Sequence, residues 1–541
     1  MSVSREPLWW RDAVIYQVYP RSWQDASGDG VGDLAGIRSR LDHLVELGID
    51  VLWVSPFYPS PMKDFGYDVS DYRGIDPLFG TMADFEALLA AVHVRGLKLL
   101  MDFVPNHSST EHPWFVESAA SRDNPKRDWY LWRDAAPDGG PPTNWMSSSG
   151  GSAWQWHEPT GQYYLHQFLP EQADLNWRNP DVRDAMLDAM RFWFDKGVDG
   201  FRLDVVYHAI VDERFRDDPA NPDFDPELQP SFSAVVPTYS TDRPEVMPLV
   251  IEPMRALADE CGERLLVGEI YLPPEKLVRY HGESPAAGVQ LPFNFQLVFA
   301  DWRAAPLATL IRRYEALIPP GEWPNWVLGN HDQSRIASRI GPARARLAAM
   351  LLLTLRGTPT LYQGDELGMT DVDIPPDRVR DPWEVNMPGK GEGRDPVRTP
   401  MRWDATPNGG FCPESVEPWL PMGDDVESVN VAVEREDPGS MLALHRTLLA
   451  LRRERCLLGT GDYASIGTQG DALVFERVHG DERTLVALNF GSSPGTVRVP
   501  EAMRALCTAS GAAIDIVGGR LELAAHEGVV VALREAGGAS S

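Results

Sequence analysis

Residues 82–107 read MADFEALLAAVHVRGLKLLMDFVPNH, and this stretch contains the repeating unit of the fold. Its first half, 82–95, has apolar residues three and four positions apart, which is typical of a helix with one buried face. The apolar run 97–104 follows, and its length and composition predict a buried strand. Pro105, Asn106 and His107 come directly after that run. The stretch therefore predicts a helix that leads into a buried strand with a polar end.

The same alternation of strand and helix recurs along most of the chain. A second segment of helical period is 180–196. Alternating strands and helices are the signature of a parallel sheet, and eight such units close into a barrel. The predicted fold class is therefore α/β, a (β/α)8 TIM barrel. Its eight predicted strands are 13–19, 51–56, 97–104, 200–206, 264–270, 289–295, 325–329 and 358–363.

Two further parts are predicted around this barrel. Roughly 95 residues separate the third and fourth strands, and this stretch is rich in Trp, Gly, Pro and Ser, so 105–172 is predicted to be an inserted subdomain. After an irregular stretch and a helix at 441–455, the pattern changes to short strands without helices. The predicted domains are a barrel of 1–104 and 173–455, the insertion, and a C-terminal all-β sandwich at 456–541. Strands within the sandwich are predicted at 472–477, 484–489, 495–499 and 528–533.

The charge balance excludes some classes of partner. The net charge of −29 repels phosphate backbones and anionic lipid surfaces, so neither nucleic acid nor a membrane is expected as a partner. Only four cysteines occur, with no CxxC pair, and residues 1–10 lack an apolar stretch after a basic start. We therefore expect a cytoplasmic protein, either a monomer or a homodimer.

Polar residues follow the ends of five predicted strands. In a parallel barrel these ends meet at one face, where catalytic groups collect. Several charged groups at equivalent strand ends indicate a shared polar pocket, because each alone is costly to bury. The segments are 102–107, 202–204, 268–269, 329–332 and 363–366.

Three carboxylates in this pocket are candidates for catalysis. Glycoside hydrolysis needs two, one protonated to assist the leaving oxygen and one that attacks the sugar or activates water. The candidates are Asp204, Glu269 and Asp332. Arg202 lies two residues before Asp204, so both side chains point to the same side of the strand and the guanidinium can keep Asp204 ionised. This favours Asp204 as the nucleophile and leaves the roles of the other two open.

Four ordered motifs resemble the signature regions of the alpha-amylase superfamily, glycoside hydrolase family 13. They are DFVPNH at 102–107, GFRLD at 200–204, VGEI at 267–270 and GNHDQ at 329–333. Three more segments resemble the alpha-glucosidase and oligo-1,6-glucosidase branch of that family. These are WWRDAVIYQVYP at 9–20, QADLNW at 172–177 and RTPMRW at 398–403.

This resemblance implies a retaining double displacement on an alpha-glucoside. Asp204 would attack the anomeric carbon, Glu269 would protonate the leaving oxygen and then activate water, and Asp332 would stabilise the transition state through sugar hydroxyls. The resemblance also implies that His107, Phe168, Arg202 and His331 contact the sugar at the cleavage site, and that no organic cofactor is needed.

The segment GYD at 66–68 resembles a family segment that closes the pocket. The resemblance implies that Tyr67 stacks on glucose, that Asp68 binds its far hydroxyls, and that Arg398 pairs with Asp68. A pocket closed in this way accepts only a chain end. The implied activity is therefore exo-acting release of terminal non-reducing alpha-glucose from short oligosaccharides or alpha-glucosides.

A separate segment, DASGDGVGD at 25–33, predicts a structural Ca²⁺ or Mg²⁺ site. Oxygen ligands at alternate positions, with Gly at the sixth, match the start of a calcium loop. Position twelve is Gly36 and not Glu, so the segment is not an EF-hand, but it resembles the metal loop of the alpha-glucosidase branch with Ser27 in place of Asn. The predicted ligands are Asp25, Ser27, Asp29, the Val31 carbonyl and Asp33.

Several alternatives stay open at this level. Val205, after the nucleophile, is compatible with a preference for alpha-1,6 links, yet a methyl-scale difference is worth only about 1 to 3 kcal/mol, so the linkage is open. Transfer of glucose to an alcohol uses the same covalent intermediate, so some transglucosylation is expected. A disaccharide isomerase of the trehalose-synthase or sucrose-isomerase type shares every catalytic motif. A non-catalytic binding barrel and a metal-dependent hydrolase are the remaining rivals.

Overall fold

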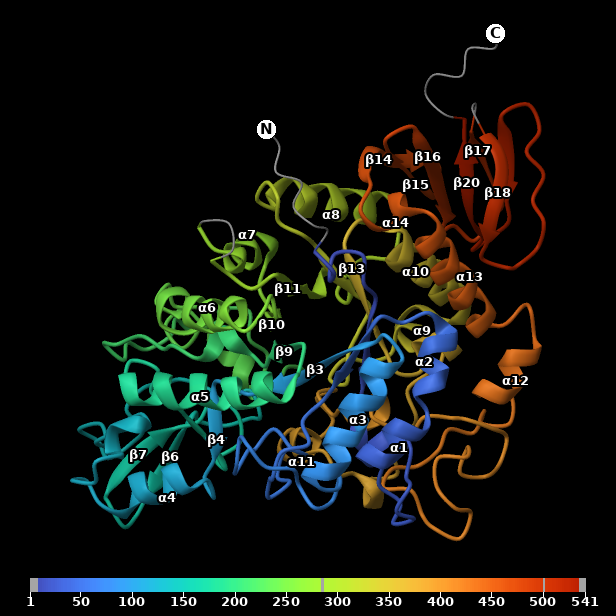
Figure 1. The fold of residues 1–541 in the computed structure, drawn as a ribbon. Coiled ribbons are helices and arrows are strands. Elements are labelled where there is room, and N and C mark those ends of the chain that lie inside the picture. The colour runs from blue at the N-terminus through green and yellow to red at the C-terminus, as the bar shows by residue number, and fades with distance from the viewer. Residues whose placement is uncertain (1–7, 284–286, 500–501, 535–541) are drawn as a thin grey trace.

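A computed structural model of the chain describes residues 8–283, 287–499 and 502–534, and its centre is a closed barrel of eight parallel strands (Figure 1). Each of the eight strands predicted from the sequence is one of these, so the TIM-barrel prediction is confirmed. The strands, in order around the barrel, are β1 (Ile15–Val18), β13 (Thr358–Tyr362), β12 (Asn325–Val327), β11 (Leu291–Asn294), β10 (Leu265–Glu269), β9 (Gly200–Leu203), β3 (Lys98–Phe103) and β2 (Val51–Val54).

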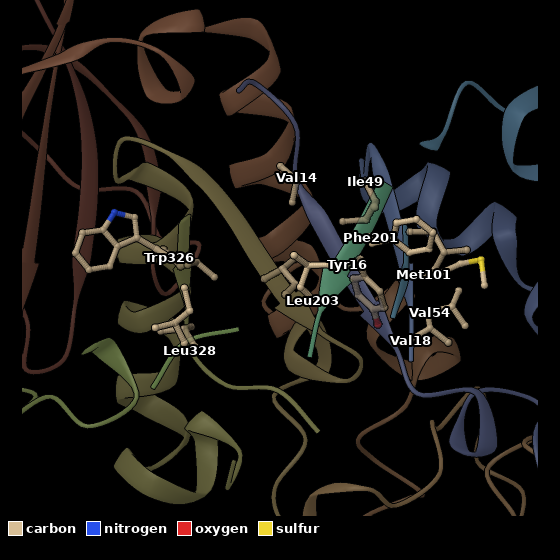
Figure 2. Close-up of a cluster of buried hydrophobic side chains, with 14 of the residues drawn as sticks. Val14, Tyr16, Val18, Ile49, Val54, Met101, Phe201, Leu203, Trp326 and Leu328 are labelled. Atoms are coloured by element: carbon tan, nitrogen blue, oxygen red, sulfur yellow. The ribbon is translucent and has the colours of Figure 1, made fainter. Parts of the chain in front are cut away.

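The barrel strands are apolar on both faces, which is why their sequences are continuous apolar runs. Alternate side chains belong to two separate clusters, because successive residues of a strand point to opposite sides. In β1, Tyr16 and Val18 belong to the large cluster shown in Figure 2, whereas Ile15 packs with Val51 and Val267 in a second cluster inside the barrel. By the same alternation, Arg202 and Glu269 point into the barrel at the carboxyl ends of β9 and β10.

Helices cover the outside of the barrel, and local capping marks the starts of the predicted helices at 82–95 and 180–196. Helix α3 (Met82–Val94) begins with a capping box between Thr81 and Asp84, and α5 (Pro180–Lys196) begins at Asn179 and ends at left-handed Gly197. The other helices packed around the barrel are α1 (Leu34–Ser39), α2 (Leu41–Leu47), α6 (Glu252–Glu260), α7 (Pro274–Leu277), α8 (Ala304–Leu317), α9 (Ile336–Ile340), α10 (Pro342–Thr354) and α13 (Met441–Glu454).

Two long excursions leave the barrel at the carboxyl ends of its strands. The first follows β3 and forms small antiparallel sheets, which lie far from the C-terminal strands in Figure 1. Its elements are β4 (His107–Ser109), α4 (Pro113–Ala120), β5 (Trp132–Arg133), β6 (Trp154–His157), β7 (Gln162–Leu165) and β8 (Gln172–Asp174). The second, 209–246, follows β9 and carries only a short 3-10 helix, Ser231–Ala234, which the sequence did not predict. The domain boundaries at 104, 173 and 455 stay predictions.

After the irregular loop that follows β13, which includes short helices α11 (Pro382–Asn386) and α12 (Val431–Glu436), the chain ends in an antiparallel β domain. A five-stranded sheet and the pair β17–β19 share one apolar cluster, which confirms the predicted all-β domain. Its strands are β14 (Asp462–Gln469), β15 (Ala472–His479), β16 (Glu482–Asn489), β17 (Gly495–Arg498), β18 (Ala502–Thr508), β19 (Arg520–Leu523) and β20 (Gly528–Leu533). The sequence missed β14, β18 and β19, of which β14 is half exposed and carries few apolar residues.

Two buried arginines attach this domain to the barrel. Arg477 of β15 donates to Thr354 O at 2.6 Å, at the end of α10, and also to Gly461 O. Arg452 of the barrel helix α13 donates to Leu458 O at 2.9 Å, at the start of the C-terminal part, and to Leu355 O at 3.3 Å, in the turn that leads into β13. Neither guanidinium forms an ion pair among the described residues; backbone carbonyls accept from both, and Arg477 also lies over the Tyr463 ring, 4.9 Å from its centroid.

None of the described helices is both long and apolar enough to cross a bilayer. The predicted lack of a leader concerns residues 1–10, of which residues 1–7 lie outside the described part of the chain.

Gly200 is predicted to be irreplaceable in the barrel wall. A Cβ there would lie 2.1 Å from Leu265 O and 2.8 Å from Leu100 Cδ2, so Gly200→Ala forces neighbouring strands apart. We expect the free energy of unfolding to fall by about 3 kcal/mol or more, as measured by urea denaturation. Gly467→Ala is the matched control, because a Cβ at Gly467 meets no atom within 4 Å. Equal stability of the two variants would contradict the prediction.

Candidate functional site

A cavity of about 920 Å³ opens at the carboxyl ends of the barrel strands. The three candidate carboxylates line it together with residues from both excursions and from the long loop after β13. The sequence-predicted residues in its wall are Tyr67, His107, Phe168, Asp204, Glu269 and Asp332. The structure thus brings the catalytic candidates from three different strand ends into one pocket.

Arg202 is the centre of the pocket floor. Its Nη1 donates hydrogen bonds of 2.6 Å to Asp204 Oδ1 and to Asp102 Oδ1. Its Nη2 forms an ion pair of 2.6 Å with Glu269 Oε2, outside the angular range of a hydrogen bond. The arginine is 1% exposed, so one desolvated guanidinium is shared by three carboxyl groups. The alternation that places Arg202 and Asp204 on one side, predicted from the sequence, therefore brings them into direct contact.

One positive charge cannot neutralise three buried carboxylates. Burial raises the pKa of Asp204, opposed by Arg202, and the neighbouring Glu269 and Asp102 raise it further. Burial likewise raises the pKa of Glu269, and it raises that of Asp102 to about 7. The three groups therefore hold at least one proton near neutral pH, as an acid catalyst requires.

Asp332 has the opposite environment. Burial acts to raise its pKa, but His331, Arg398 and Arg394 outweigh burial and hold the pKa below its ordinary value. Because burial also keeps the pKa of His331 well below its usual range, the imidazole is neutral and the lasting charges are those of the two arginines. Arg398 Nη2 donates to Asp332 Oδ1 at 2.6 Å. Asp332 is therefore a carboxylate at neutral pH.

The predicted pair of Asp68 and Arg398 is wrong. Asp68 is fully buried, and burial raises its pKa to about 6. It accepts hydrogen bonds from Ser60 Oγ at 2.7 Å and from the backbone N–H of Lys63 at 2.9 Å, and so stabilises the loop after β2. Arg398 instead contacts Asp332 and the His331 carbonyl. The physical reason is the turn of the loop after β2, which directs Asp68 to donors of its own loop, so that it does not line the cavity.

Asp64 and Arg394 form the pair that closes the pocket. Arg394 Nη2 donates to Asp64 Oδ1 at 2.7 Å, and its guanidinium also contacts Asp381 Oδ1 at 2.7 Å and Asp332 Oδ1 at 3.4 Å. Asp64 and Arg394 both line the cavity. This pair links the loop after β2 to the long loop after β13, so it forms a wall across one end of the pocket.

His107 and Phe168 lie beside this wall. The His107 ring lies 5.3 Å from the Phe168 ring, and its Nε2 is 3.1 Å from Gln172 Nε2. Burial lowers the pKa of His107 to about 3, although the Tyr67 carbonyl at 3.2 Å opposes that shift. A neutral His107 beside an aromatic ring suits contact with the hydroxyl groups and apolar face of a sugar.

The predicted metal loop is compact, but its carboxylates serve the backbone. Asp25 accepts from Gly28 N at 2.6 Å and Gly30 N at 2.8 Å, and Asp33 accepts from Ser27 N at 2.9 Å and Gly36 N at 2.7 Å. Asp29 is exposed and accepts from Val31 N at 2.9 Å. Among the described residues no three His, Cys, Asp or Glu side chains converge as metal ligands. The donors are hard oxygens of the kind Ca²⁺ prefers, but this arrangement does not aim them at one point.

Comparisons with known proteins agree with this geometry. The family model of the alpha-amylase catalytic domain matches residues 17–461. The chain belongs to the alpha-amylase family, glycoside hydrolase family 13. The family model of the neopullulanase-like C-terminal domain matches residues 463–540 of this family member.

Among its relatives, this alpha-amylase family enzyme is 42% identical to a probable alpha-glucosidase of Rhizobium meliloti, over 91% of both chains. It is 38% identical to the oligo-1,6-glucosidase of Parageobacillus thermoglucosidasius, over 92% of this chain and 93% of the relative. The enzyme therefore lies in the alpha-glucosidase branch of the family.

Solved structures similar to this alpha-amylase family enzyme include a crystal structure of an alpha-glucosyl transfer enzyme, with a TM-score of 0.92 and 40% identity. That match covers 98% of this chain and 100% of the other. The isomaltulose synthase of Erwinia rhapontici has a TM-score of 0.88 and 31% identity, with the same coverage.

Sequence reasoning missed Asp64, Arg394 and Asp381 in this alpha-amylase family enzyme. Local spacing could not connect them, because Asp64 and Arg394 are 330 positions apart. One signal was present: Arg394 precedes the segment RTPMRW by four residues, and Asp64 precedes Tyr67 by three. A search for a second arginine and a second aspartate near the two segments would have found both.

Arg394 is predicted to be essential for stability as well as for the pocket. Replacing it with Met leaves Asp64, Asp381 and Asp332 without their shared buried cation, so the free energy of unfolding should fall by about 3 to 5 kcal/mol. Arg73→Met is the matched control: the Arg73–Asp188 pair is solvent-exposed and should contribute about 1 kcal/mol or less. Urea unfolding at pH 7 measures both, and similar losses would count against the prediction.

Proposed function

We propose that the chain is a retaining, exo-acting alpha-glucosidase that releases terminal alpha-glucose from short oligosaccharides or alpha-glucosides. The observation that carries the proposal is the shared guanidinium of Arg202, which joins two carboxyl groups of different strands at the base of a pocket with one closed end. Relatives named alpha-glucosidase and oligo-1,6-glucosidase support it.

The contacts around Arg202 support Asp204 as the nucleophile. Asp204 receives a hydrogen bond of 2.6 Å from Arg202, which stabilises its carboxylate form, whereas the contact of Arg202 with Glu269 lacks hydrogen-bond alignment. On these contacts we assign the negative charge to Asp204 and the acid role to Glu269. Both groups contact one guanidinium and so lie close together, as in retaining enzymes, whose carboxyl groups are about 5 to 5.5 Å apart.

The environment of Glu269 also supports one of its two oxygens as the acid. Oε2 faces the Arg202 guanidinium at 2.6 Å and the Val205 N–H at 3.1 Å, so both neighbours favour a negative Oε2. Among the described residues, the one hydrogen-bond donor to Oε1 is Asn330 Nδ2, at the long distance of 3.5 Å. Oε1 would therefore carry the proton to the leaving oxygen, and after departure of the aglycone the same oxygen would take a proton from water.

Asp332 would act as a carboxylate throughout the reaction. Its two arginines keep it ionised, so it can accept hydrogen bonds from sugar hydroxyls as positive charge develops at the anomeric carbon. The wall of Asp64 and Arg394 would bind the far side of the glucose and prevent a chain from passing through. This end wall is the support for exo action.

Transfer of glucose to an alcohol is part of the proposal, since one structural relative is named an alpha-glucosyl transfer enzyme. The second candidate function is disaccharide isomerisation, which is favoured by the similarity to the isomaltulose synthase structure. Both reactions would use the same glucosyl-enzyme, and they differ in what accepts the sugar.

A product time course tests the proposal. With maltose, isomaltose, sucrose and trehalose as separate substrates, we expect glucose to be the main early product, with glucosyl oligosaccharides appearing at high maltose. Glu269→Gln should slow the release of glucose by about 10² to 10⁴-fold, because proton donation to the leaving oxygen is lost. A rearranged disaccharide as the main product would show an isomerase, and unchanged turnover of Glu269→Gln would overturn the acid assignment.

We also propose that the loop 25–33 binds Ca²⁺ or Mg²⁺ as a structural ion. The support is its set of oxygen donors within nine residues, of which the Asp29 carboxylate is exposed. No catalytic step depends on the ion, because the loop does not line the cavity.

Metal binding at this loop predicts a change in stability without a change in chemistry. Saturating Ca²⁺ at 100 times its Kd should stabilise the fold by about 2.7 kcal/mol, seen as a Tm several degrees higher than in EDTA. Asp29→Asn should remove most of that difference and leave kcat at 25 °C unchanged. Equal Tm in Ca²⁺, Mg²⁺ and EDTA would reject the site.

We further propose that the protein works in the cytoplasm, as a monomer or homodimer. The support is that Cys261, Cys412 and Cys507 are free thiols in the described part of the chain, as in a reducing compartment.

A further inference from the structure

A buried glutamine on the first barrel strand, Gln17, contacts His331 on the Nδ1 side of its ring. Gln17 of β1 is fully buried and points into the barrel, where its Nε2 lies 2.8 Å from His331 Nδ1 and 3.0 Å from Ser55 Oγ. Gln17 does not line the cavity, so it can act only through the residue it touches.

The opposite edge of the His331 ring faces two groups of the pocket. His331 Nε2 lies 2.7 Å from the Tyr67 hydroxyl and 3.3 Å from Asp332 Oδ2. The ring is stacked between Tyr19, at 5.4 Å, and Tyr67, at 5.3 Å, so its plane is fixed. What is left to determine is which ring nitrogen carries the proton.

Tyr67 determines the direction of this chain of hydrogen bonds. Its single O–H donates to Asp102 Oδ2 at 3.1 Å, so its oxygen is free to accept from His331 Nε2. Asp332, which Arg398 keeps ionised, also needs a donor and not a lone pair at 3.3 Å. Both neighbours therefore require a proton on Nε2, and a neutral ring then has a lone pair on Nδ1.

The lone pair on Nδ1 in turn requires Gln17 to donate. In this orientation the amide oxygen of Gln17 lacks a hydrogen-bond partner among the described residues. In the reversed orientation the buried NH₂ group would be the one without a partner, and orphan donors are rarer in proteins than orphan carbonyl oxygens. The chain therefore runs in one direction, from Gln17 through His331 and Tyr67 to Asp102, which accepts from Arg202 as well.

We propose that Gln17 is a positioning residue that fixes His331 in its Nε2–H tautomer and so orients the hydrogen bonds toward Asp332, Tyr67 and the Arg202 centre. Its effect on activity rests on the proposed glucosidase function, whereas the tautomer does not. Tyr67 and Asp332 favour the same tautomer, so Gln17 adds to their effect; without its donor at Nδ1 the Nε2–H tautomer loses one of three stabilising contacts, and part of the population moves its proton to Nδ1. The pocket would lose a donor on the side where the sugar binds.

The tautomer can be measured directly. In protein labelled with ¹⁵N at the histidine rings, the His331 signals, assigned by their absence in His331→Gln, should show a protonated Nε2 and an unprotonated Nδ1 at pH 7. Gln17→Met removes the donor at nearly constant volume and should move part or all of the proton to Nδ1. A wild-type ring protonated at Nδ1 would overturn the proposal without any need for a Gln17 variant to fold.

Kinetics supply the second readout. On 4-nitrophenyl alpha-glucoside, Gln17→Met should lower kcat at least tenfold with KM within threefold, at a Tm close to wild type. Ser55→Ala removes the other partner of the Gln17 amide and is the matched control, with the wild-type tautomer and kcat within twofold. A Gln17→Met enzyme with full kcat would overturn the positioning role. Wild-type protein without glucose release would reject the proposed function and leave the tautomer result intact.

Discussion

The buried guanidinium of Arg202 is the interaction on which the pocket depends. It reaches Asp102, Asp204 and Glu269 from one position in the barrel wall, at 2.6 Å in each case. Such a group costs several kcal/mol to desolvate, and only its carboxylate partners offset that cost. The same sharing leaves too little positive charge for three anions. Arg202 therefore both assembles the floor of the pocket and keeps a proton there.

A second centre of positive charge, Arg394 with Arg398, has the opposite effect on Asp332. The pocket region thus holds two groups of carboxyls with different protonation. His331 and Tyr67 connect Asp332 to Asp102 through a contact of 3.3 Å between His331 Nε2 and Asp332 Oδ2 and through two hydrogen bonds of Tyr67. This division lets one pocket hold an acid and a permanent carboxylate at the same pH.

The barrel could be predicted because its strands are apolar on both faces and are punctuated by helices of clear period. The floor of the pocket could be predicted for a related reason, since Arg202 and Asp204 share a strand and its alternation. The end wall could not, because Asp64 and Arg394 meet only through tertiary folding, and Asp68 was the nearer but wrong choice beside Tyr67. The excursion 209–246 was missed because it has almost no regular structure. Strand β14 was missed because half of its residues are exposed.

Because Arg452 and Arg477 anchor the C-terminal sheet to the barrel, the barrel depends on the sheet for part of its stability. Both side chains hold the segment that turns from α10 into β13, and β13 is the strand that completes the barrel against β1. Exchange of this sheet between family members would therefore need a compatible arginine at position 477 together with the carbonyls that receive it. Loss of Arg477 would leave the Thr354 carbonyl without this buried donor, at the end of α10 from which the chain turns into β13.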